Sequence, residues 1–317
     1  MISGADTKVV AFGGGHGLAA TLTALRDLTP NITAVVTVAD NGGSSGKIRS
    51  EFNFLPPGDL RMALAALCGA DSWGQSWAET IQHRFTSEGE LNGHALGNLL
   101  LAALWDSSDD LVAGIDRVGA LLKIVGRVLP MSLEPLDIEG MFTTSGGEKV
   151  VRGQIEVATA KGKLKSLQLL PKNPEVTPQV LQAIADAHWL TFGPGSWFSS
   201  VMPHFLLSDL SQAISQSSAK KIMIFNLPDP EDADEFAGST PEEHLELVLA
   251  HSPEFRFDVA IADPAILSQE NRLESLVNKC GGELILAEVS KSSDKNHHDP
   301  AKMSSLLSHI FGTTLLR

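Results

Sequence analysis

The first chemistry that the sequence offers is the binding of an anion by a glycine-rich turn. This turn consists of Gly13, Gly14, Gly15, His16 and Gly17, and it follows an apolar run at residues 9–12. Glycines let backbone N–H groups approach a phosphate closely, and the N-terminus of a following helix adds partial positive charge. The alternative is a tight turn that serves only packing, but the expected strand before it and helix after it favour an anion site.

The turn does not match the complete dinucleotide-binding fingerprint. The pattern G-x-G-x-x-G needs a glycine where this chain has Leu18. An NAD(P)-dependent oxidoreductase is therefore the third and weakest interpretation, and it rests on the βαβ pattern of the first forty residues alone.

A second segment of small polar residues follows the apolar run at residues 32–39. It consists of Asp40, Asn41, Gly42, Gly43, Ser44, Ser45, Gly46 and Lys47. An acid about 20 residues beyond a glycine turn is placed to bind a ribose. The small residues behind it favour a second anion cradle or a substrate loop, and the alternative is a flexible Gly/Ser loop.

Two enzyme motifs are nearly present in this segment. A P-loop is excluded because Asn41 and Ile48 stand where that motif needs a glycine and a Ser or Thr. The pattern G-x-S-x-G around Ser44 formally matches a serine hydrolase, but Ser44 lies too far beyond the expected strand to form a nucleophile elbow.

Two pairs of polar residues follow on expected helices. Asp59 and Arg61, behind two prolines and a glycine, could hold Mg²⁺ and a phosphate, whereas the structural alternative makes Asp59 the N-cap of its helix. His94 and Asn98 are spaced i, i+4 on an apolar helix and therefore share one face. Either the two side chains form hydrogen bonds inside the protein or they line a pocket, and we favour the pocket.

A further glycine turn, Gly193, Pro194, Gly195 and Ser196, again ends an expected strand and precedes a helix, and Asn226 ends another strand. Such turns all open on one edge of a parallel sheet, where ligands bind. The expected ligand-binding residues are Gly13, Gly14, Gly15, His16, Gly17, Asp40, Asn41, Gly42, Gly43, Ser44, Arg61, His94, Asn98, Gly193, Pro194, Gly195, Ser196 and Asn226. Asp40 and Asp59 are the candidates for catalysis or for holding Mg²⁺. His297 and His298 lie in a polar run that favours a surface loop over a metal site.

The elements that must position these residues alternate between strands and helices. Short apolar β-branched runs separate helical patterns, which predicts an α/β fold with a Rossmann-like parallel sheet and helices on both faces. We expect one domain over residues 1–317, with helices that include 59–69, 75–85, 94–106, 109–126 and 198–216. Residues 131–175 are expected to form an antiparallel insertion, in which strands 154–160 and 164–170 meet across a hairpin at 161–163.

The composition excludes several classes of function. With 38 Asp and Glu against 24 Lys and Arg, the net charge is −14, which argues against binding nucleic acid. Two cysteines cannot build a disulfide framework or a four-thiolate metal site, and they favour the reducing cytoplasm. No signal segment and no membrane span is expected, since no apolar run approaches about 18 residues. An anion would have to be held by backbone N–H groups and a few cations, for which Lys47, Arg49 and Arg61 are the candidates.

Five segments together resemble one known family. They are GGGHGL, VTVADNGGSSG, PPGDLR, GHALGNLLLAAL and GPGSWFSSVMP. In kind and order they are similar to the bacterial gluconeogenesis factors (YvcK type), which are related to the 2-phospho-L-lactate transferases of the CofD-like superfamily. The resemblance implies a Rossmann-like domain with an inserted subdomain and a ligand of the UDP-sugar type. It also implies a part in cell shape and cell-wall morphogenesis during gluconeogenic growth, with no established reaction.

The chain departs from the family pattern at Asn41, where the family commonly has an aspartate. The change removes one carboxylate that could hold Mg²⁺ and favours the non-transferase branch. Our first hypothesis is therefore a cytoplasmic protein whose small-molecule partner is a nucleotide or nucleotide sugar. The chain could also form homo-oligomers. The rival is a Mg²⁺-dependent transferase that moves a phospho-acyl group from a nucleoside diphosphate carrier, with Asp40 or Asp59 as metal ligand or base.

Overall fold

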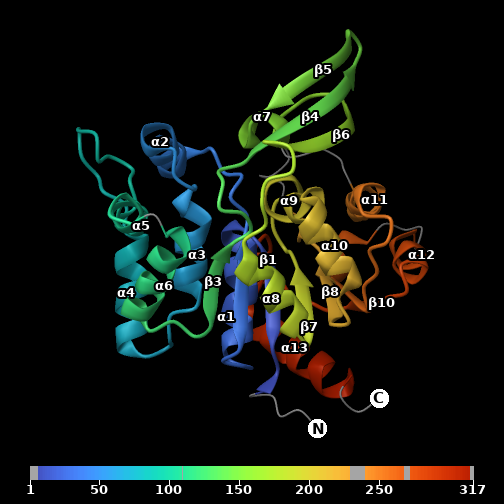
Figure 1. Ribbon diagram of the computed structural model, residues 1–317. Coiled ribbons are helices and arrows are strands. Elements are labelled where there is room, and N and C mark those ends of the chain that lie inside the picture. The colour runs from blue at the N-terminus through green and yellow to red at the C-terminus, as the bar shows by residue number, and fades with distance from the viewer. Residues whose placement is uncertain (1–5, 109, 229–239, 268–271, 315–317) are drawn as a thin grey trace.

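The computed structural model describes residues 6–108, 110–228, 240–267 and 272–314. A central parallel sheet runs through the molecule with helices on both faces, and a smaller sheet stands above one end of it (Figure 1). The predicted α/β fold with a Rossmann-like sheet is therefore confirmed. Among the described helices, none is long and apolar enough to cross a membrane.

The central sheet has seven strands in the order β10-β9-β8-β7-β1-β2-β3. All its pairings are parallel. The strands are β1 (Val9–Gly13), β2 (Ile32–Val36), β3 (Arg127–Pro130), β7 (Trp189–Phe192), β8 (Lys220–Ile224), β9 (Val259–Ala262) and β10 (Glu283–Leu286). The chain builds outward from β1 on one side and then returns to β7 on the other, so the strand order reverses between β1 and β7. In a sheet of this kind such a switch point is where ligands bind.

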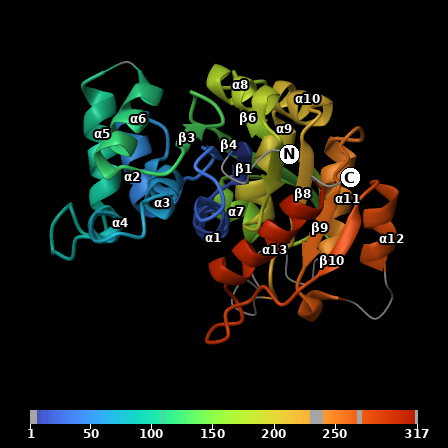
Figure 2. The same ribbon diagram turned by 90° about the horizontal axis from the view of Figure 1, so that it is seen from below.

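Helices cover the sheet on both faces. On one face α1 (Gly15–Arg26) packs against α13 (Pro300–Thr314), and α8 (Pro178–Asp186), α9 (Met202–Leu206) and α10 (Ser208–Gln216) lie on the other (Figure 2). Near the β10 edge lie α11 (Pro241–His251), which follows β8 in the chain, and α12 (Arg272–Lys279), which follows β9. Strands such as β1 are buried on both sides, which explains their uninterrupted apolar sequences.

A cluster of helices stands beside the other edge strand, β3. It comprises α2 (Gly43–Phe52), α3 (Pro57–Ala66), α4 (Ser72–Gln82), α5 (Leu96–Asp106) and α6 (Leu111–Leu122). The helices expected near 59–69, 75–85, 94–106 and 109–126 are thus confirmed to within a few residues. The segment after Asp40 is not a flexible loop, because α2 begins at Gly43.

The smaller sheet is antiparallel, with the order β5-β4-β6, and consists of β4 (Asp137–Thr144), β5 (Gly147–Arg152) and β6 (Lys163–Leu170). The predicted strand over 154–160 is wrong: residues Gln154–Ala158 form helix α7. The hairpin joins β4 to β5 instead, and Gly153, with φ +109°, ends β5 and turns the chain into α7. A short apolar run fits a strand or a buried helical turn equally well, and here the positive φ of the preceding glycine decides between them.

The single helix expected over 198–216 is also wrong. The chain forms a π-helical turn at Trp197–Val201, then α9, then α10. Pro203 cannot donate to a preceding turn, and Leu207 is extended, so the helix is interrupted twice. The broken segment leaves the π-helical turn beside the end of β1.

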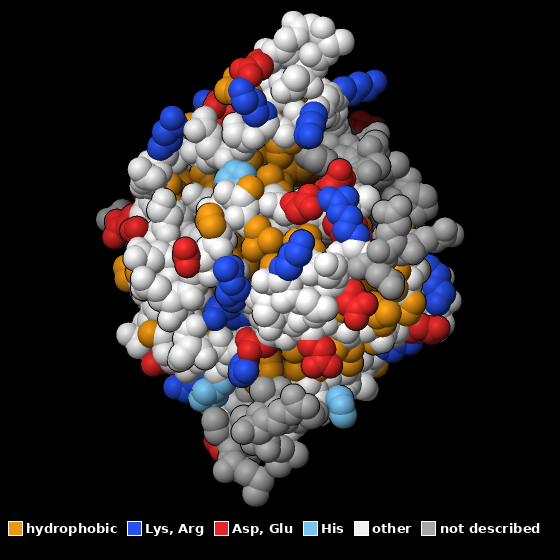
Figure 3. Space-filling model, turned by 90° about the vertical axis from the view of Figure 1, so that its right-hand side faces the viewer, with side chains coloured by type: hydrophobic (Ala, Val, Ile, Leu, Met, Phe, Trp, Pro, Cys, Tyr) orange, Lys and Arg blue, Asp and Glu red, His pale blue; other side chains and the backbone are white. Residues whose placement is uncertain are grey.

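Charged side chains of both signs are interspersed over the face shown in Figure 3. On that face Lys and Arg do not gather into a single basic area.

Candidate functional site

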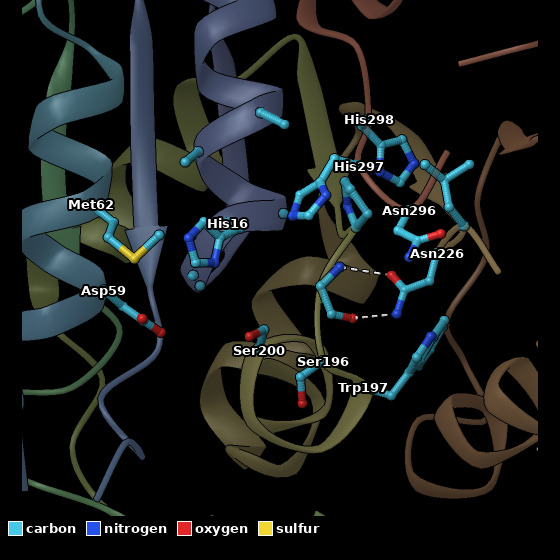
Figure 4. A pocket seen from close by; sticks show the side chains of 18 of the residues that line it. His16, Asp59, Met62, Ser196, Trp197, Ser200, Asn226, Asn296, His297 and His298 are labelled. Carbon is cyan, nitrogen blue, oxygen red and sulfur yellow. Dashed lines mark hydrogen bonds between the residues drawn. The ribbon is translucent and has the colours of Figure 1, made fainter. Parts of the chain in front are cut away.

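A cavity of about 1310 Å³ opens where β1 and β7 end, at the switch point of the sheet. We call it the cleft. Its wall includes residues 14–17, 194–200, 225–228 and 296–298, together with side chains from α3 and α7 (Figure 4). The two predicted glycine turns therefore meet on one edge of the sheet, as expected for a ligand site in this fold.

The first glycine turn begins α1 and approaches the second turn very closely. Gly15 has φ +56°, a conformation that favours glycine. A Cβ atom on Gly17 would lie 2.1 Å from the carbonyl oxygen of Pro194. Any side chain at residue 17 would therefore push the two turns apart, and the glycine is needed for backbone-to-backbone contact.

The second turn is held in place by hydrogen bonds from both sides. The hydroxyl of Thr21 donates to the carbonyl oxygen of Gly193 at 3.3 Å. Asn226 accepts from the N–H of Gly195 at 2.8 Å and donates to its carbonyl oxygen at 2.9 Å, as the dashed lines in Figure 4 show. Asn226 thus lies in the wall of the cleft, but its amide positions the turn.

Ser196 is the N-cap of the π-helical turn. Its hydroxyl oxygen accepts hydrogen bonds from the N–H and the hydroxyl of Ser199, at 3.2 and 2.7 Å. The hydroxyl that the sequence assigned to ligand binding therefore also stabilises the local backbone.

Asp59 lies in the wall of the cleft beside the first glycine turn (Figure 4). Burial raises the pKa of its carboxyl to about 7, and repulsion from Asp40 contributes to the increase. The N–H of Gly15 at the start of α1 donates to this carboxyl and opposes the shift. The predicted N-cap role is wrong, because α3 begins at Pro57 with Pro56 as its N-cap.

Cationic groups gather at the start of α1 although the whole chain is acidic. His16, Lys291 and His297 all line the cleft, and the rings of the two histidines meet edge to face with centroids 6.4 Å apart. Burial lowers the pKa of His16, and the positive charges of His297, Arg61 and Lys291 lower it further. Such mutual repulsion is relieved when an anion binds among the cations.

The sequence did not place two of the histidines that line the cleft. His297 and His298 were assigned to a surface loop, but both line the cleft, and His298 is 7% exposed. Their segment folds back on itself through the Ser290–His298 bridge, which carries it to the cleft. Arg49, which we expected near the ligand, instead forms an ion pair with Asp137 at 2.6 Å and donates to the carbonyl oxygen of Leu136.

Four other predicted site residues form a separate cluster that we call the buried network: Ser44, Arg61, His94 and Asn98. Each is at most 9% exposed, and none lines the cleft. Arg61 Nε donates to Asn98 Oδ1 at 2.9 Å, and Asn98 Nδ2 donates to Ser44 Oγ at 3.0 Å. Ser44 Oγ lies 3.1 Å from His94 Nδ1. The expectation that His94 and Asn98 line the pocket is therefore wrong.

The buried network adjoins the cleft through one residue. Arg61 also donates to Gln82, which lines the cleft. Burial, together with repulsion from Arg84, lowers the pKa of Arg61 to about 10. A buried guanidinium whose hydrogen-bond acceptors are neutral amides is costly unless every bond is kept, so these bonds fix the position of α5 against α3.

Asp40, Asn41, Gly42 and Gly43 form the turn that leads into α2. Asp40 Oδ1 accepts from the N–H of Gly42 at 2.8 Å, and Asn41 Nδ2 donates to Glu156 of α7 at 3.5 Å. None of the four lines the cleft. Asp40 is nevertheless near enough to Asp59 to raise the pKa of that carboxyl.

Two neighbouring carboxylates could hold a divalent ion. Mg²⁺ in nucleotide sites is often bound by one or two carboxylates together with the phosphates of the ligand. Asp59 lines the cleft and could share such an ion with a ligand, whereas Asp40 lies outside the wall of the cleft. Within the described ranges, no group of three or more His, Cys, Asp or Glu residues is arranged to hold a metal. The residues therefore fit an ion brought with a diphosphate, and they do not form a metal cage of their own.

The fold and the cleft define a Rossmann-like α/β protein with a large cavity at the switch point of its sheet. The family model described as "2-phospho-L-lactate transferase CofD" matches residues 9–309, so the chain belongs to the CofD family. A "Putative gluconeogenesis factor" of Mycobacterium tuberculosis is 43% identical over 309 residues, which cover 95% of this chain and 90% of that protein. A "Gluconeogenesis factor" of Halalkalibacterium halodurans is 37% identical over 244 residues, covering 77% of this chain and 73% of that protein.

A solved structure agrees with these relatives. The crystal structure of a UPF0052 family member from Bacillus halodurans has a TM-score of 0.82 and 32% sequence identity, and the match covers 95% of this chain and 98% of that one. The resemblance drawn from the five segments is thus confirmed, and so is the fold class.

Proposed function

We propose that this member of the gluconeogenesis-factor family binds a nucleotide sugar of the UDP type in the cleft. The observation that carries the proposal is the contact between the two glycine turns at the switch point. Together they present backbone N–H groups and the start of α1 to one cavity, which suits a diphosphate. At about 1310 Å³ the cleft exceeds the usual range of roughly 300–1,000 Å³ for small-molecule sites, so an extended ligand of two parts can enter.

The cations around the cleft support a charged ligand. Lys291 supplies positive charge beside His16 and His297, although the chain as a whole carries −14. Backbone N–H groups and a few cations can therefore hold an anion without a basic surface.

The aromatic side of the cleft supports a nucleoside. Trp197 and Phe225 line it, and their rings stack with centroids 6.2 Å apart. Trp197 also stacks on His244 at 4.8 Å. Trp197 and Phe225 are only 2% and 1% exposed, so the stacked rings form a buried apolar floor for this part of the cleft, which suits the less polar part of a nucleotide.

The names of the relatives support the physiological part of the proposal. Those names bear on gluconeogenic growth alone. We propose further that binding of a cell-wall precursor sugar serves cell shape and cell-wall morphogenesis during such growth, in the cytoplasm. The protein then acts as a sensor of the sugar nucleotide, and no turnover is required.

Calorimetric titration of the purified protein with UDP-N-acetylglucosamine, UDP-glucose, GDP and NAD tests this function. We expect binding of the UDP-sugars, and a Lys291→Ala variant should bind them about fivefold more weakly because it lacks one cation. Lys47→Ala is the matched control, since Lys47 does not line the cleft. The absence of heat with every UDP-sugar would refute the proposal.

A second candidate function is a Mg²⁺-dependent transferase. The specific observation in its favour is the proximity of Asp40 and Asp59, together with the transferase description of the family model. A bound Mg²⁺ would supply charge neutralisation at a diphosphate, and Asp40 and Asp59 are the residues that would hold it. Incubation with lactyl-diphosphoguanosine, the deazaflavin alcohol and saturating Mg²⁺ tests this function, because the absence of transferred product excludes it.

A further inference from the structure

Strand β5 forms an open edge of the inserted sheet. The strand order is β5-β4-β6, so among the described strands β5 pairs with β4 on one side and with none on the other. Every residue of β5 except Val151 is exposed. Figure 1 shows β5 at the end of the molecule opposite α13. An open strand edge of this kind is a template for pairing with another strand.

The register of the β4–β5 hairpin shows which backbone groups face this open edge. Thr144 and Gly147 are opposed across a two-residue turn, and such a closing pair exchanges both of its hydrogen bonds. Because hydrogen-bonded pairs alternate along an antiparallel ladder, every second residue of β5 bonds to β4. The residues between them, Glu148, Val150 and Arg152, direct their N–H and C=O groups away from β4.

These three residues form a pattern that is complementary to itself. Their side chains share one face of the sheet, because they are spaced i, i+2. Val150 is 55% exposed, and Glu148 and Arg152 lie two residues to either side of it. When two copies of β5 pair antiparallel about Val150, Glu148 of each copy is opposite Arg152 of the other. Each opposed pair then exchanges two backbone hydrogen bonds, and the two valines meet.

Both charged side chains can take a second partner. Glu148 forms an ion pair with Lys165 of β6, and Arg152 Nε donates to Asp137 at 2.9 Å. These pairs leave the side chain of Glu148 54% exposed and that of Arg152 59% exposed. A carboxylate has about four acceptor sites and a guanidinium has five N–H donors, so each can form one more ion pair.

Charge favours this register over its neighbours. Pairing centred on residue 149 would place Lys149 opposite its own copy, and like charges that are directly opposed are destabilising. Pairing centred on residue 151 would place Arg152 opposite Val150, where it has no charge to meet. Only pairing centred on Val150 sets opposite charges across both ends of the contact.

We propose that β5 is a self-association surface, through which two copies of this protein pair antiparallel about Val150. The pairing joins the two inserted sheets into one continuous sheet, and the same residues of both copies form the contact, as in other twofold-symmetric dimers. The paired strands are short, so the dimer is reversible and its population depends on protein concentration. This inference does not depend on which ligand the cleft binds.

Sedimentation velocity of the full chain, from about 10 µM to about 1 mM, tests the proposal. The wild type should shift from monomer towards dimer over this range. Glu148→Arg and Arg152→Glu should each weaken self-association by at least about tenfold, because each sets like charges opposite one another at both ends of the contact. An equimolar mixture of the two variants should restore the dimer, since every charged pair across their contact is again of opposite sign.

Two further variants separate pairing through the β5 backbone from other kinds of association. Val150→Pro removes an N–H group that faces the open edge and leaves the bonds to β4 intact, so it should also weaken the dimer by at least about tenfold. Lys163→Glu is the matched control, because Lys163 is an exposed residue of the opposite edge strand, β6. It should keep the dimer within about twofold.

Four results would overturn the proposal. The first is a wild type that stays monomeric up to about 1 mM. The second is self-association that Glu148→Arg or Val150→Pro leaves unchanged. The third is a mixture of the two charge variants that stays monomeric. The fourth is an equal loss in Lys163→Glu and Glu148→Arg, since the loss would then come from the charge of the inserted sheet as a whole.

Discussion

The cleft and the buried network both contain polar and ionisable side chains, but the two regions differ in how the hydrogen bonds and charges of these side chains are matched. In the buried network, Arg61, Asn98 and Ser44 are joined to one another by hydrogen bonds of 2.9 and 3.0 Å. In the cleft, His16 faces other cations and Asp59 is near Asp40. One region is complete within the protein, whereas the other has charges that its own residues do not balance.

This difference predicts which substitutions change the stability of the protein and which change its affinity for a ligand. A polar cluster with every bond made contributes to the folded state and gains little from a ligand. A region with unbalanced charge is less stable alone and gains from a ligand that supplies the missing partners. We therefore expect substitutions in the two regions to change different measured quantities.

The largest effect is expected for Asn98→Leu in the buried network. The substitution leaves Arg61 Nε without its acceptor, and it should lower the free energy of unfolding by about 3 kcal/mol, measured by urea denaturation. The affinity for UDP should stay within about twofold. Gln182→Leu on the surface of α8 is the control, and it should cost less than about 0.5 kcal/mol. A loss of ligand affinity without a loss of stability would show that the network belongs to the binding site.

An intermediate effect is expected for Asp59→Asn in the cleft. The pKa of Asp59 is about 7 in the folded protein, above its ordinary value of 3.8, so the folded state keeps a proton that the unfolded state releases between these pH values. The stability of the wild type should therefore fall from pH 4 to pH 7 because of this group, and Asp59→Asn should remove that decrease.

At pH 8 the Asp59→Asn variant should exceed the wild type in stability by roughly 1–3 kcal/mol, and at pH 4 the two should be nearly equal. Thermal unfolding across this pH range measures the difference. Asp209→Asn, which changes an exposed aspartate of α10, should leave the pH profile of the wild type unchanged. If the stability of Asp59→Asn changed with pH in the same way as that of the wild type, the raised pKa of Asp59 would be contradicted.

The smallest effect is expected at His16. Its pKa lies below the ordinary value, so the ring is mostly neutral at pH 7, and a bound diphosphate should raise the pKa and draw a proton from the buffer. Calorimetry in buffers of different ionisation enthalpy should therefore show proton uptake at pH 6.5. His16→Gln should reduce this uptake and weaken UDP binding by about threefold. His83→Gln is the control, and an undiminished uptake in His16→Gln would assign the proton to another group.

The sequence predicted the fold well because its signals are local. Buried parallel strands such as β1 are uninterrupted apolar runs, and the glycine turns mark where strands end. The strand expected over 154–160 failed because its short apolar pattern fits two structures, and the decision came from the positive φ of Gly153.

The site was only partly predictable. Both glycine turns could be located, since their close approach requires glycine itself at positions such as 17. Asn98 lies on α5, whereas His94 precedes that helix, and the positions of both side chains are fixed by contacts with α2 and α3 that no local pattern encodes. Lys291 and His297 were missed because their segment reaches the cleft through a fold-back, and its sequence is that of an ordinary polar loop.

The walls of the cleft come from widely separated parts of the chain, so the ribosome synthesises them at different times. The first glycine turn ends at Gly17, and the last wall residue is Pro300. At about 5–20 residues per second, roughly 15–60 s separate the emergence of these two parts from the ribosome. A nascent chain therefore cannot be stabilised by its ligand before these last wall residues have been synthesised, and chains that stop earlier gain no such protection from proteolysis.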